Sequence, residues 1–236
     1  MVATAFQTEI EFTEIEFCGN RVQLDASGCL YWPEERLLVV SDLHLEKGSS
    51  FAAKRGLFVP PYDTSATLEN LAFRIGYWDP KVVISLGDSF HDQEAYGRLS
   101  ENSRQRLNQL MAGREWVWVY GNHDPCPVAE MGGTFCQILQ IGSLNFLHEP
   151  LVEFQQGEIA GHLHPSAKIR KRGKSVRRRC FVGDQSRIIL PAFGAFTGGL
   201  NIRDHAYDGL FSQQDLRVWM LSKDNLFAIN AKDCIR

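Results

Sequence analysis

Three apolar segments of this chain each end in a cluster of acidic, amide or histidine side chains. They are residues 36–42 (RLLVVSD), 81–88 (KVVISLGD) and 115–124 (EWVWVYGNHD). Segments with helical character, residues 62–75 and 100–113, lie between them. Strands that alternate with helices predict parallel βαβ units, and the ligand sites of such sheets lie beyond the carboxyl ends of the strands. We therefore expect the three polar clusters to meet at one edge of a sheet.

The second half of the chain has a different pattern. Short strand-like runs broken by glycine and turn residues occupy residues 133–150, 157–165, 177–193 and 216–230, which is typical of strands joined by turns. The chain has no internal repeat and no low-complexity linker, and 44% of its residues are hydrophobic, which suffices for a sizeable core. We predict a single α/β domain over residues 1–236, with mixed sheets.

Targeting signals and cysteine motifs narrow the setting of the protein. The segment MVATAFQTEIEF lacks the basic and apolar regions of a signal peptide, and no apolar run reaches the roughly 20 residues that cross a membrane. The 6 cysteines form no CxxC pair, so we expect reduced structural thiols and no zinc ribbon or redox motif. These features favour a cytoplasmic protein without a membrane partner.

The end of the first apolar segment indicates a metal site. Asp42 and His44 are separated by one residue. If the strand continues through Leu43, both side chains point to the same face, because side chains alternate along a strand. A carboxylate and a neutral imidazole that converge in this way form half of a metal site. The alternative is a surface turn in which Asp42 caps the next segment and His44 is solvated.

The same residue types recur at the ends of the later apolar runs. The candidate metal ligands are Asp42, His44, Asp88, Asn122, His148, His162 and His164. Nitrogen and oxygen donors of this kind suit two divalent ions such as Mn²⁺, Fe²⁺ or Zn²⁺. Each histidine could instead satisfy a separate structural partner, but a series of polar clusters in order, each at a predicted strand end, favours the metal site. His162 and His164 form a second pair spaced by one residue, expected on one strand face.

The order of these motifs resembles that of the calcineurin-like metallophosphoesterases: D-x-H (42–44), G-D (87–88), G-N-H-D (121–124), a lone His148 and G-H-x-H (161–164). The resemblance implies a two-sheet β-sandwich of mixed sheets flanked by helices (α-β-β-α) and a centre with two metal ions. It also implies these ligands: Asp42, His44 and His164 for one ion, Asn122, His148 and His162 for the other, and Asp88 as the bridge. His123 would be the catalytic residue, protonating the leaving oxygen or steadying the phosphate.

A narrower resemblance extends over nearly the whole chain. LYWPEERLLVVSDLHLEKGSSFAAKRG, VPPYDT, GHLHP and LPAFGAFTGGLN are similar to the bacterial ligase-associated DNA damage response endonuclease branch. That branch implies a Mn²⁺-dependent phosphodiesterase or nuclease, and DNA ligase and helicase repair proteins as partners. Many family members have a third acid after Gly-Asp; here His91 and Asp92 occupy that neighbourhood, in a role that the pattern does not define.

Lysine and arginine are concentrated in one segment. Residues 168–179 (KIRKRGKSVRRR) hold eight of them, and the rest of the chain has 17 basic against 28 acidic residues. Such a segment beside a phosphoryl-transfer site can follow a nucleic-acid backbone, with substrate contacts expected from Arg170, Lys171, Arg172 and Lys174. The alternative is a solvated hairpin that balances the charge of an acidic body.

These features together predict a phosphoesterase that hydrolyses phosphodiesters, DNA foremost, by attack of a hydroxide held between two metal ions, most readily Mn²⁺. Neither a GxSxG motif nor a P-loop is present to supply another chemistry. Two alternatives stay open. One is a small-molecule phosphatase or cyclic-nucleotide phosphodiesterase with the same site, and the other is a non-catalytic scaffold of the same fold. The sequence leaves the oligomeric state open.

Overall fold

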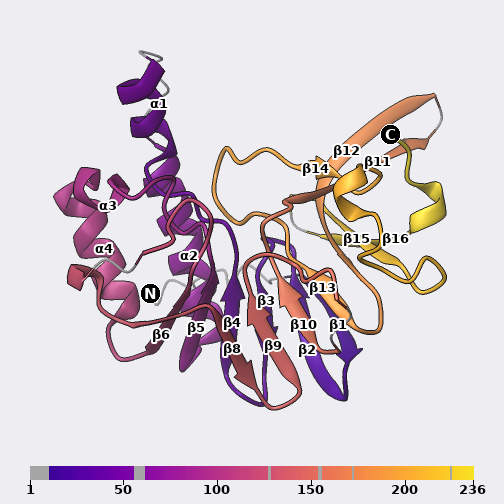
Figure 1. Cartoon of the computed structure of the whole chain (residues 1–236), viewed down its shortest axis with the longest axis horizontal. Coiled ribbons are helices and arrows are strands. Elements are labelled where there is room, and N and C mark those ends of the chain that lie inside the picture. The colour runs from indigo at the N-terminus through magenta and orange to yellow at the C-terminus, as the bar shows by residue number, and fades with distance from the viewer. Residues whose placement is uncertain (1–10, 56–61, 127–128, 154–155, 172, 224) are drawn as a thin grey trace, which may run out of the picture.

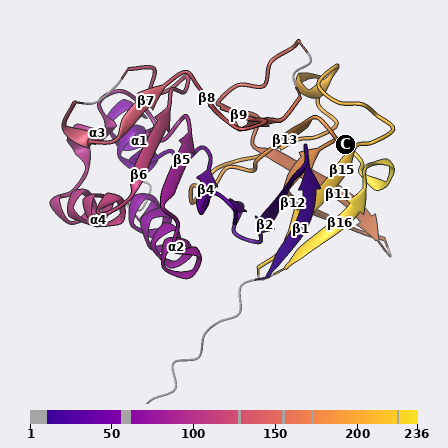
Figure 2. The same ribbon diagram turned by 90° about the horizontal axis from the view of Figure 1, so that it is seen from below.

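The structure is a computed structural model that describes residues 11–236, except 56–61, 127–128, 154–155, 172 and 224. Two β-sheets pack face to face, and the α-helices lie beside the first sheet (Figure 1, Figure 2). Within the described residues, no helix is both long and apolar enough to cross a membrane. The predicted fold class, an α/β sandwich of mixed sheets, is confirmed.

The first sheet has seven strands in chain order: β1 (Phe12–Phe17), β2 (Asn20–Asp25), β3 (Leu30–Trp32), β4 (Leu37–Val40), β5 (Val82–Leu86), β6 (Glu115–Val119) and β7 (Thr134–Cys136). Strands β1 to β4 are antiparallel, and β4 to β7 are parallel. The parallel half contains the three predicted strands. The helices between them are α1 (Lys47–Arg55), α2 (Asp63–Trp78), α3 (Ala95–Arg98) and α4 (Glu101–Met111).

The second sheet is built from the rest of the chain. Its strands are β8 (Ile138–Ile141), β9 (Leu144–Leu147), β10 (Glu158–Ala160), β11 (Pro165–Lys171), β12 (Lys174–Gly183), β13 (Arg187–Ile189), β14 (Leu200–Asn201), β15 (Arg217–Leu221) and β16 (Leu226–Asn230). The order is β14-β11-β12-β13-β10-β9-β8, and β15 pairs with β12 and β16. Strands β9, β10 and β13 are parallel, so this sheet is also mixed.

Three apolar clusters explain the layers. One, including Val83 and Leu71, lies between the first sheet and helices α2 and α4. The second, including Ile84 and Phe181, lies between the two sheets. The third covers the outer face of the second sheet, where the 3-10 turns η2 (His205–Tyr207) and η3 (Ala231–Asp233) pack. Burying both faces of each sheet explains why β4 and β5 read as continuous apolar runs.

Local signals account for both ends of helix α4. The Ser100 side chain accepts a hydrogen bond from the backbone N–H of Ser103 and caps α4. Gly113 follows the helix with φ of +76°, a conformation that glycine adopts without steric cost. The turn returns the chain into β6, so that β4, β5 and β6 end at the same edge of the sheet.

Candidate metal centre

The predicted site lies in loops beyond the carboxyl ends of the parallel strands, as expected. Strand β4 ends at Val40, so Asp42 and His44 belong to the loop that follows. Their φ angles are +53° and +44°, which excludes the extended conformation on which the alternation argument rested. The expected strand face is therefore wrong for this pair. Both side chains still enter the same group, together with His164.

The second histidine pair departs further from expectation. Strand β10 ends at Ala160, and His162 and His164 have φ angles of +68° and +45°. Their side chains enter two different groups instead of sharing one strand face. Asp88 also has a positive φ, +46°. Non-glycine residues rarely adopt this conformation, and such strain concentrates at functional sites.

Six of the predicted ligands form two compact groups. Asp42, His44 and His164 make the first, and Asp88, His148 and His162 make the second. In each group, one donor atom from every residue lies within 4.8 Å of the others. The Nε2 atoms of His44 and His164 are 3.2 Å apart, as are Nδ1 of His162 and Nε2 of His148. Two imidazole nitrogens that face each other at this distance are arranged as donors around a shared cation.

Asp88 reaches both groups. Its Oδ2 atom is 3.9 Å from Nε2 of His44, and its Oδ1 atom is 3.5 Å from Nε2 of His148. Only 5% of the side chain is exposed. A carboxylate in this position can give one oxygen to each of two cations.

Three glycines allow the loops to approach one another. A Cβ atom on Gly161 would lie 1.8 Å from Ser41 Oγ, and one on Gly121 would lie 2.1 Å from the backbone nitrogen of Asp88. On Gly87 it would lie 2.5 Å from the His148 ring. Each glycine directly precedes a predicted ligand, so the G-D, G-N and G-H pairs are required by packing.

Asp124 supports the site in a role that the sequence analysis did not assign. Its Oδ1 atom accepts hydrogen bonds from the backbone N–H groups of Asp88 and Gly121, at 2.9 and 3.1 Å. Its Oδ2 atom accepts from Ser89 and Phe90, at 2.7 and 3.1 Å. One carboxylate thus ties the loop after β5 to the loop after β6. The signal available in the sequence was the acid at the end of G-N-H-D.

The histidines are oriented by backbone carbonyls and by each other. The Nδ1–H of His148 donates to the carbonyl of Leu86 at 2.8 Å, which leaves Nε2 to face Asp88 and His162. The Nδ1–H of His123 donates to the carbonyl of His91 at 2.9 Å, so its Nε2 is directed toward the site, 3.9 Å from Asp88 Oδ2. A carbonyl can only accept, so each contact defines the ring tautomer.

The pKa values of several candidate ligands are shifted toward the forms that bind cations. Burial lowers the pKa of His44 to about 3 and lowers that of His162, so both rings are neutral near pH 7. Burial by itself would raise the pKa of Asp42, but His164, His148 and His44 outweigh it and lower this pKa. Burial by itself would also lower the pKa of His164, but its hydrogen bond to Asp42 and the charge of that carboxylate outweigh burial and raise this pKa. Neutral imidazoles and ionised carboxylates are the forms that bind metals, so a bound cation would displace a proton from His164. The donor set therefore fits a pair of divalent cations.

The structure also locates the residues around the two groups. Asn122 is exposed in the turn after β6, between Gly121 and His123. The His123 ring stacks on that of His91, with centroids 5.1 Å apart. Asp92 accepts hydrogen bonds from Ser50 Oγ at 2.7 Å and Arg98 Nη2 at 2.8 Å, so it connects α1 to α3.

The basic segment forms the hairpin of β11 and β12, which begins directly after His164. Figure 1 shows it projecting from the second sheet, away from helices α1 to α4. Arg170, Lys171 and Lys174 are exposed, whereas Arg172 lies outside the described residues. In the register, Arg170 pairs with Ser175, and Lys171 pairs with Lys174. Because side chains alternate, Lys171 and Lys174 lie on the face opposite Arg170.

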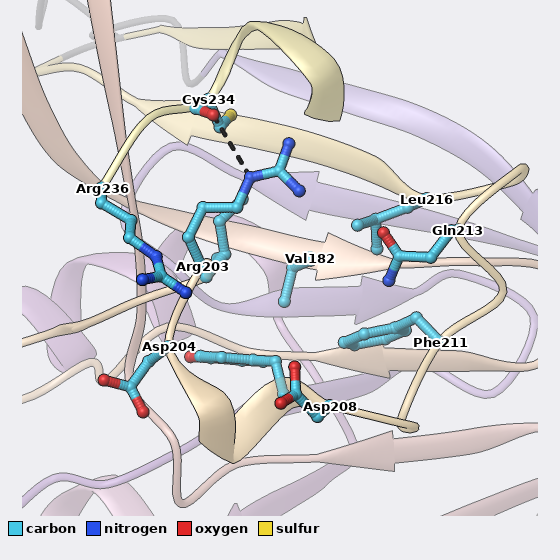
Figure 3. Close-up of a pocket in the computed structure, with 11 residues that line it drawn as sticks. Val182, Arg203, Asp204, Asp208, Phe211, Gln213, Leu216, Cys234 and Arg236 are labelled. Atoms are coloured by element: carbon cyan, nitrogen blue, oxygen red, sulfur yellow. Dashed lines mark hydrogen bonds between the residues drawn. The ribbon is translucent and has the colours of Figure 1, made fainter.

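A further pocket, of about 570 Å³, lies on the outer face of the second sheet (Figure 3). Arg203 is among its lining residues and donates to the carbonyl of Cys234 at 3.2 Å. Tyr207, also in the lining, donates from its hydroxyl to the carbonyl of Leu163 at 3.1 Å. The pocket wall thereby supports the segment that carries His162 and His164.

A sandwich of two mixed sheets, with carboxylates and imidazoles gathered beyond its strand ends in two candidate cation-binding groups, is the arrangement expected of a metal-dependent phosphoesterase. The chain belongs to the calcineurin-like phosphoesterase family, whose model matches residues 35–189. It is a hydrolase, and its family binds two divalent metal ions.

The chain is also similar to solved structures. The chain is 27% identical to the nuclease MPE of Pseudomonas putida, with a TM-score of 0.71 over 93% of this chain and 100% of that chain. It is 16% identical to Yfce, a phosphoesterase from E. coli, with a TM-score of 0.37 over 85% and 96% of the two chains. No curated protein sequence matches the chain.

Proposed function

We propose that this hydrolase cleaves phosphodiester bonds in nucleic acid, with DNA as the main substrate and Mn²⁺ as the main metal. The observation that carries this proposal is the position of Asp88 between the two groups, within 3.9 Å of His44 and 3.5 Å of His148. The proposed ligands are Asp42, His44 and His164 for one ion, Asn122, His148 and His162 for the other, and Asp88 for both.

The chemistry divides between the metals and the side chains. When bound, two divalent ions activate a water molecule and neutralise charge on the transferring phosphoryl group. His123 is the proposed catalytic acid, because its Nε2 atom faces Asp88 while Nδ1 is held by the His91 carbonyl. A protonated Nε2 at this position donates its proton to the leaving oxygen. The ring is half exposed, so it can reach a substrate at the surface of the site.

Two observations support a nucleic-acid substrate over a small phosphate ester. The β11–β12 hairpin starts immediately after His164 and carries exposed cations from Arg170 onward, and cationic surfaces bind the phosphate backbone. The nuclease from Pseudomonas putida is similar over almost the full length of this chain. By the narrower sequence resemblance, we also propose a role in DNA repair beside ligase or helicase proteins.

A substrate panel tests this proposal. Metal-free protein is loaded with Mn²⁺, Mg²⁺ or Zn²⁺ and supplied with a nitrophenyl monoester, bis-nitrophenyl phosphate, and single-stranded and duplex DNA. We expect Mn²⁺-dependent cleavage of the diester and of DNA, with two metal ions bound per chain. Cleavage of the monoester alone would instead identify a small-molecule phosphatase. Failure to bind metal would identify a scaffold.

A further inference from the structure

One loop connects the two ends of the first metal group. Residues 192–199 begin where the Phe193 N–H donates to the carbonyl of Ser41 at 2.8 Å and the Gly194 N–H donates to that of Asp42 at 3.2 Å. They end where the Leu200 N–H donates to the carbonyl of His164 at 2.9 Å. A Cβ on Gly194 would lie 2.2 Å from the carbonyl oxygen of Leu43, so the contact is close. The loop is therefore an edge of the metal centre.

The loop presents an aromatic ring to solvent. Phe196 is 73% exposed and has a φ of +59°. This conformation costs about 1–2 kcal/mol for a residue with a side chain, and exposure forgoes the stabilisation that burying the ring would provide. The backbone around it is anchored, because the Ala195 N–H donates to Thr67 Oγ1 at 2.9 Å and Thr197 Oγ1 donates to the Gly194 carbonyl at 2.8 Å. The backbone is thus fixed in an unfavourable conformation that exposes the Phe196 ring, which indicates that the ring contacts a ligand.

The Arg179 side chain and Phe196 line the same cavity. The cavity, of about 360 Å³, is lined by Phe196, Thr197, Asn70 and Arg179, among others. Burial lowers the pKa of the Arg179 guanidinium, which donates to the carbonyl of Ala192 at 2.5 Å. Among the residues that the structure describes, no carboxylate forms an ion pair with it. A largely buried guanidinium without an acidic partner favours the approach of an anion.

The hairpin extends this cationic surface. Arg179 pairs with Ser166, and Arg177 pairs with Lys168 in the next position of the same face. Arg177 donates to the carbonyl of Gly199, so this face of the hairpin is turned toward the loop. Arg170 continues the same face toward the hairpin tip. A strand that leaves the metal centre over Phe196 would meet these cations in succession.

We propose that Phe196 and Arg179 form a nucleotide-binding subsite beside the metal centre, in which Phe196 stacks on an unpaired base and Arg179 binds the adjacent phosphate. The inference rests on the proposed function and names its substrate class as single-stranded nucleic acid, including unpaired ends. Bases within a duplex are stacked on their neighbours, so an aromatic side chain gains access to a base face in single strands. A small aryl diester occupies the metal centre without reaching the subsite.

The test uses variants that distinguish the contribution of the Phe196 ring from that of the loop backbone. Phe196→Gly removes the ring and suits the positive φ, so the loop conformation is retained. Phe196→Tyr keeps an aromatic face. Phe227→Ala is the matched control, because Phe227 is 54% exposed on β16, at an edge of the second sheet. Each variant is assayed with a single-stranded oligonucleotide and with bis-nitrophenyl phosphate.

We expect Phe196→Gly to lower kcat/KM on the oligonucleotide by about 10-fold or more, since one stacked base contributes roughly that much. Activity on bis-nitrophenyl phosphate should stay within about twofold, and Phe196→Tyr and Phe227→Ala should match the wild type on both substrates. Arg179→Gln should reduce the slope of log affinity against log salt by about 0.7 for single strands, as expected for one phosphate contact.

Three results would overturn the subsite. The first is unchanged cleavage of the oligonucleotide by Phe196→Gly. The second is an equal loss on both substrates, which would show that the loop only supports the metal centre. The third is an Arg179→Gln variant with an unchanged salt slope. A wild-type protein that hydrolyses bis-nitrophenyl phosphate but no DNA would contradict the nucleic-acid function itself, and this outcome is recognised before any variant is made.

Discussion

The carboxylate of Asp124 provides the sharpest test of how the site is held. It accepts four backbone N–H groups, two on each oxygen, from the loops that carry Asp88 and His123. Asp124→Asn keeps the shape of the side chain but replaces one oxygen with an NH₂ group. That group is a donor, so it faces two backbone donors and leaves both without an acceptor.

The size of the effect follows from this count. Burial raises the pKa of Asp124 to about 7, so its hydrogen bonds are only partly those of a charged group near neutral pH. A buried donor that is left without an acceptor costs about 1–3 kcal/mol, so the two donors left unpaired in Asp124→Asn should lower the free energy of unfolding by about 2–6 kcal/mol. Domains are stable by only about 5–15 kcal/mol, so this loss is a large fraction of the total. Separation of the two loops should also weaken metal binding, because Asp88 and its neighbours would no longer be held in place.

Urea unfolding of the metal-free protein measures the free energy of unfolding. Mn²⁺ titration, followed by turnover of bis-nitrophenyl phosphate, measures the metal affinity. Asp184→Asn is the control. The Asp184 carboxylate also accepts backbone N–H groups, from Ser186, Arg187 and Ser212. Asp184 precedes the amino end of β13. Because β13 is parallel to β10, this end lies opposite the carboxyl end of β10, where the loop with His162 and His164 begins.

In Asp184→Asn, an NH₂ group at the position of Oδ2 would leave only the Ser212 N–H without an acceptor, so stability should fall slightly. Metal affinity and turnover per folded molecule should stay those of the wild type. The reasoning is refuted if the free energy of unfolding of Asp124→Asn lies within about 1 kcal/mol of the wild type, a difference too small for two unpaired buried donors. It is also refuted if the two variants have the same metal affinity.

Asp88→Asn should abolish Mn²⁺-supported diesterase activity while circular dichroism shows a retained fold; activity within about threefold of wild type would exclude a bridging carboxylate, since even 1.4 kcal/mol is tenfold. His123→Ala should keep both metals and lose more turnover on alkyl than on nitrophenyl diesters, because acid catalysis matters most for basic leaving groups; equal losses would indicate phosphate positioning only. Burial lowers the pKa of His44 from 6.5 to about 3. Between pH 6.5 and 3, His44 therefore binds a proton in the unfolded chain but not in the metal-free folded protein. The free energy of unfolding should fall as the pH is lowered through this range. His44→Gln should reduce that dependence by up to about 1.4 kcal/mol per pH unit in urea titrations at pH 6.5, 5.5 and 4.5; an unchanged slope would contradict a neutral His44. Arg170→Gln should weaken DNA binding and its salt dependence more than Lys171→Gln, because Arg170, unlike Lys171, shares the hairpin face on which Arg177 contacts Gly199 of the 192–199 loop. Equal effects would show that the substrate contacts both faces.

The sequence alone determined the parallel half of the fold and the chemical identity of the candidate ligands. Apolar runs that end in Asp88 or Asn122 mark buried strands with polar carboxyl ends, and strand order then brings those ends to one edge. The strands β1, β2 and β3 were not predicted. Strand β1 is largely exposed and mixes apolar with polar residues, so its place in the sheet depends on pairing with β2.

The tertiary structure decided the backbone geometry that brings the ligands of each group together. Periodicity placed the side chains of His162 and His164 on one strand face, but the left-handed backbone at both residues sends them to different groups, the division that the family resemblance implies. His44 and His164 meet across 120 positions of sequence because both loops emerge at the same sheet edge. The role of Asp124 depends on the same convergence, since its four donors come from two separate loops. Alternation along a strand is a local rule, whereas the geometry of this site comes from loop backbones that only the packed sheets hold in place.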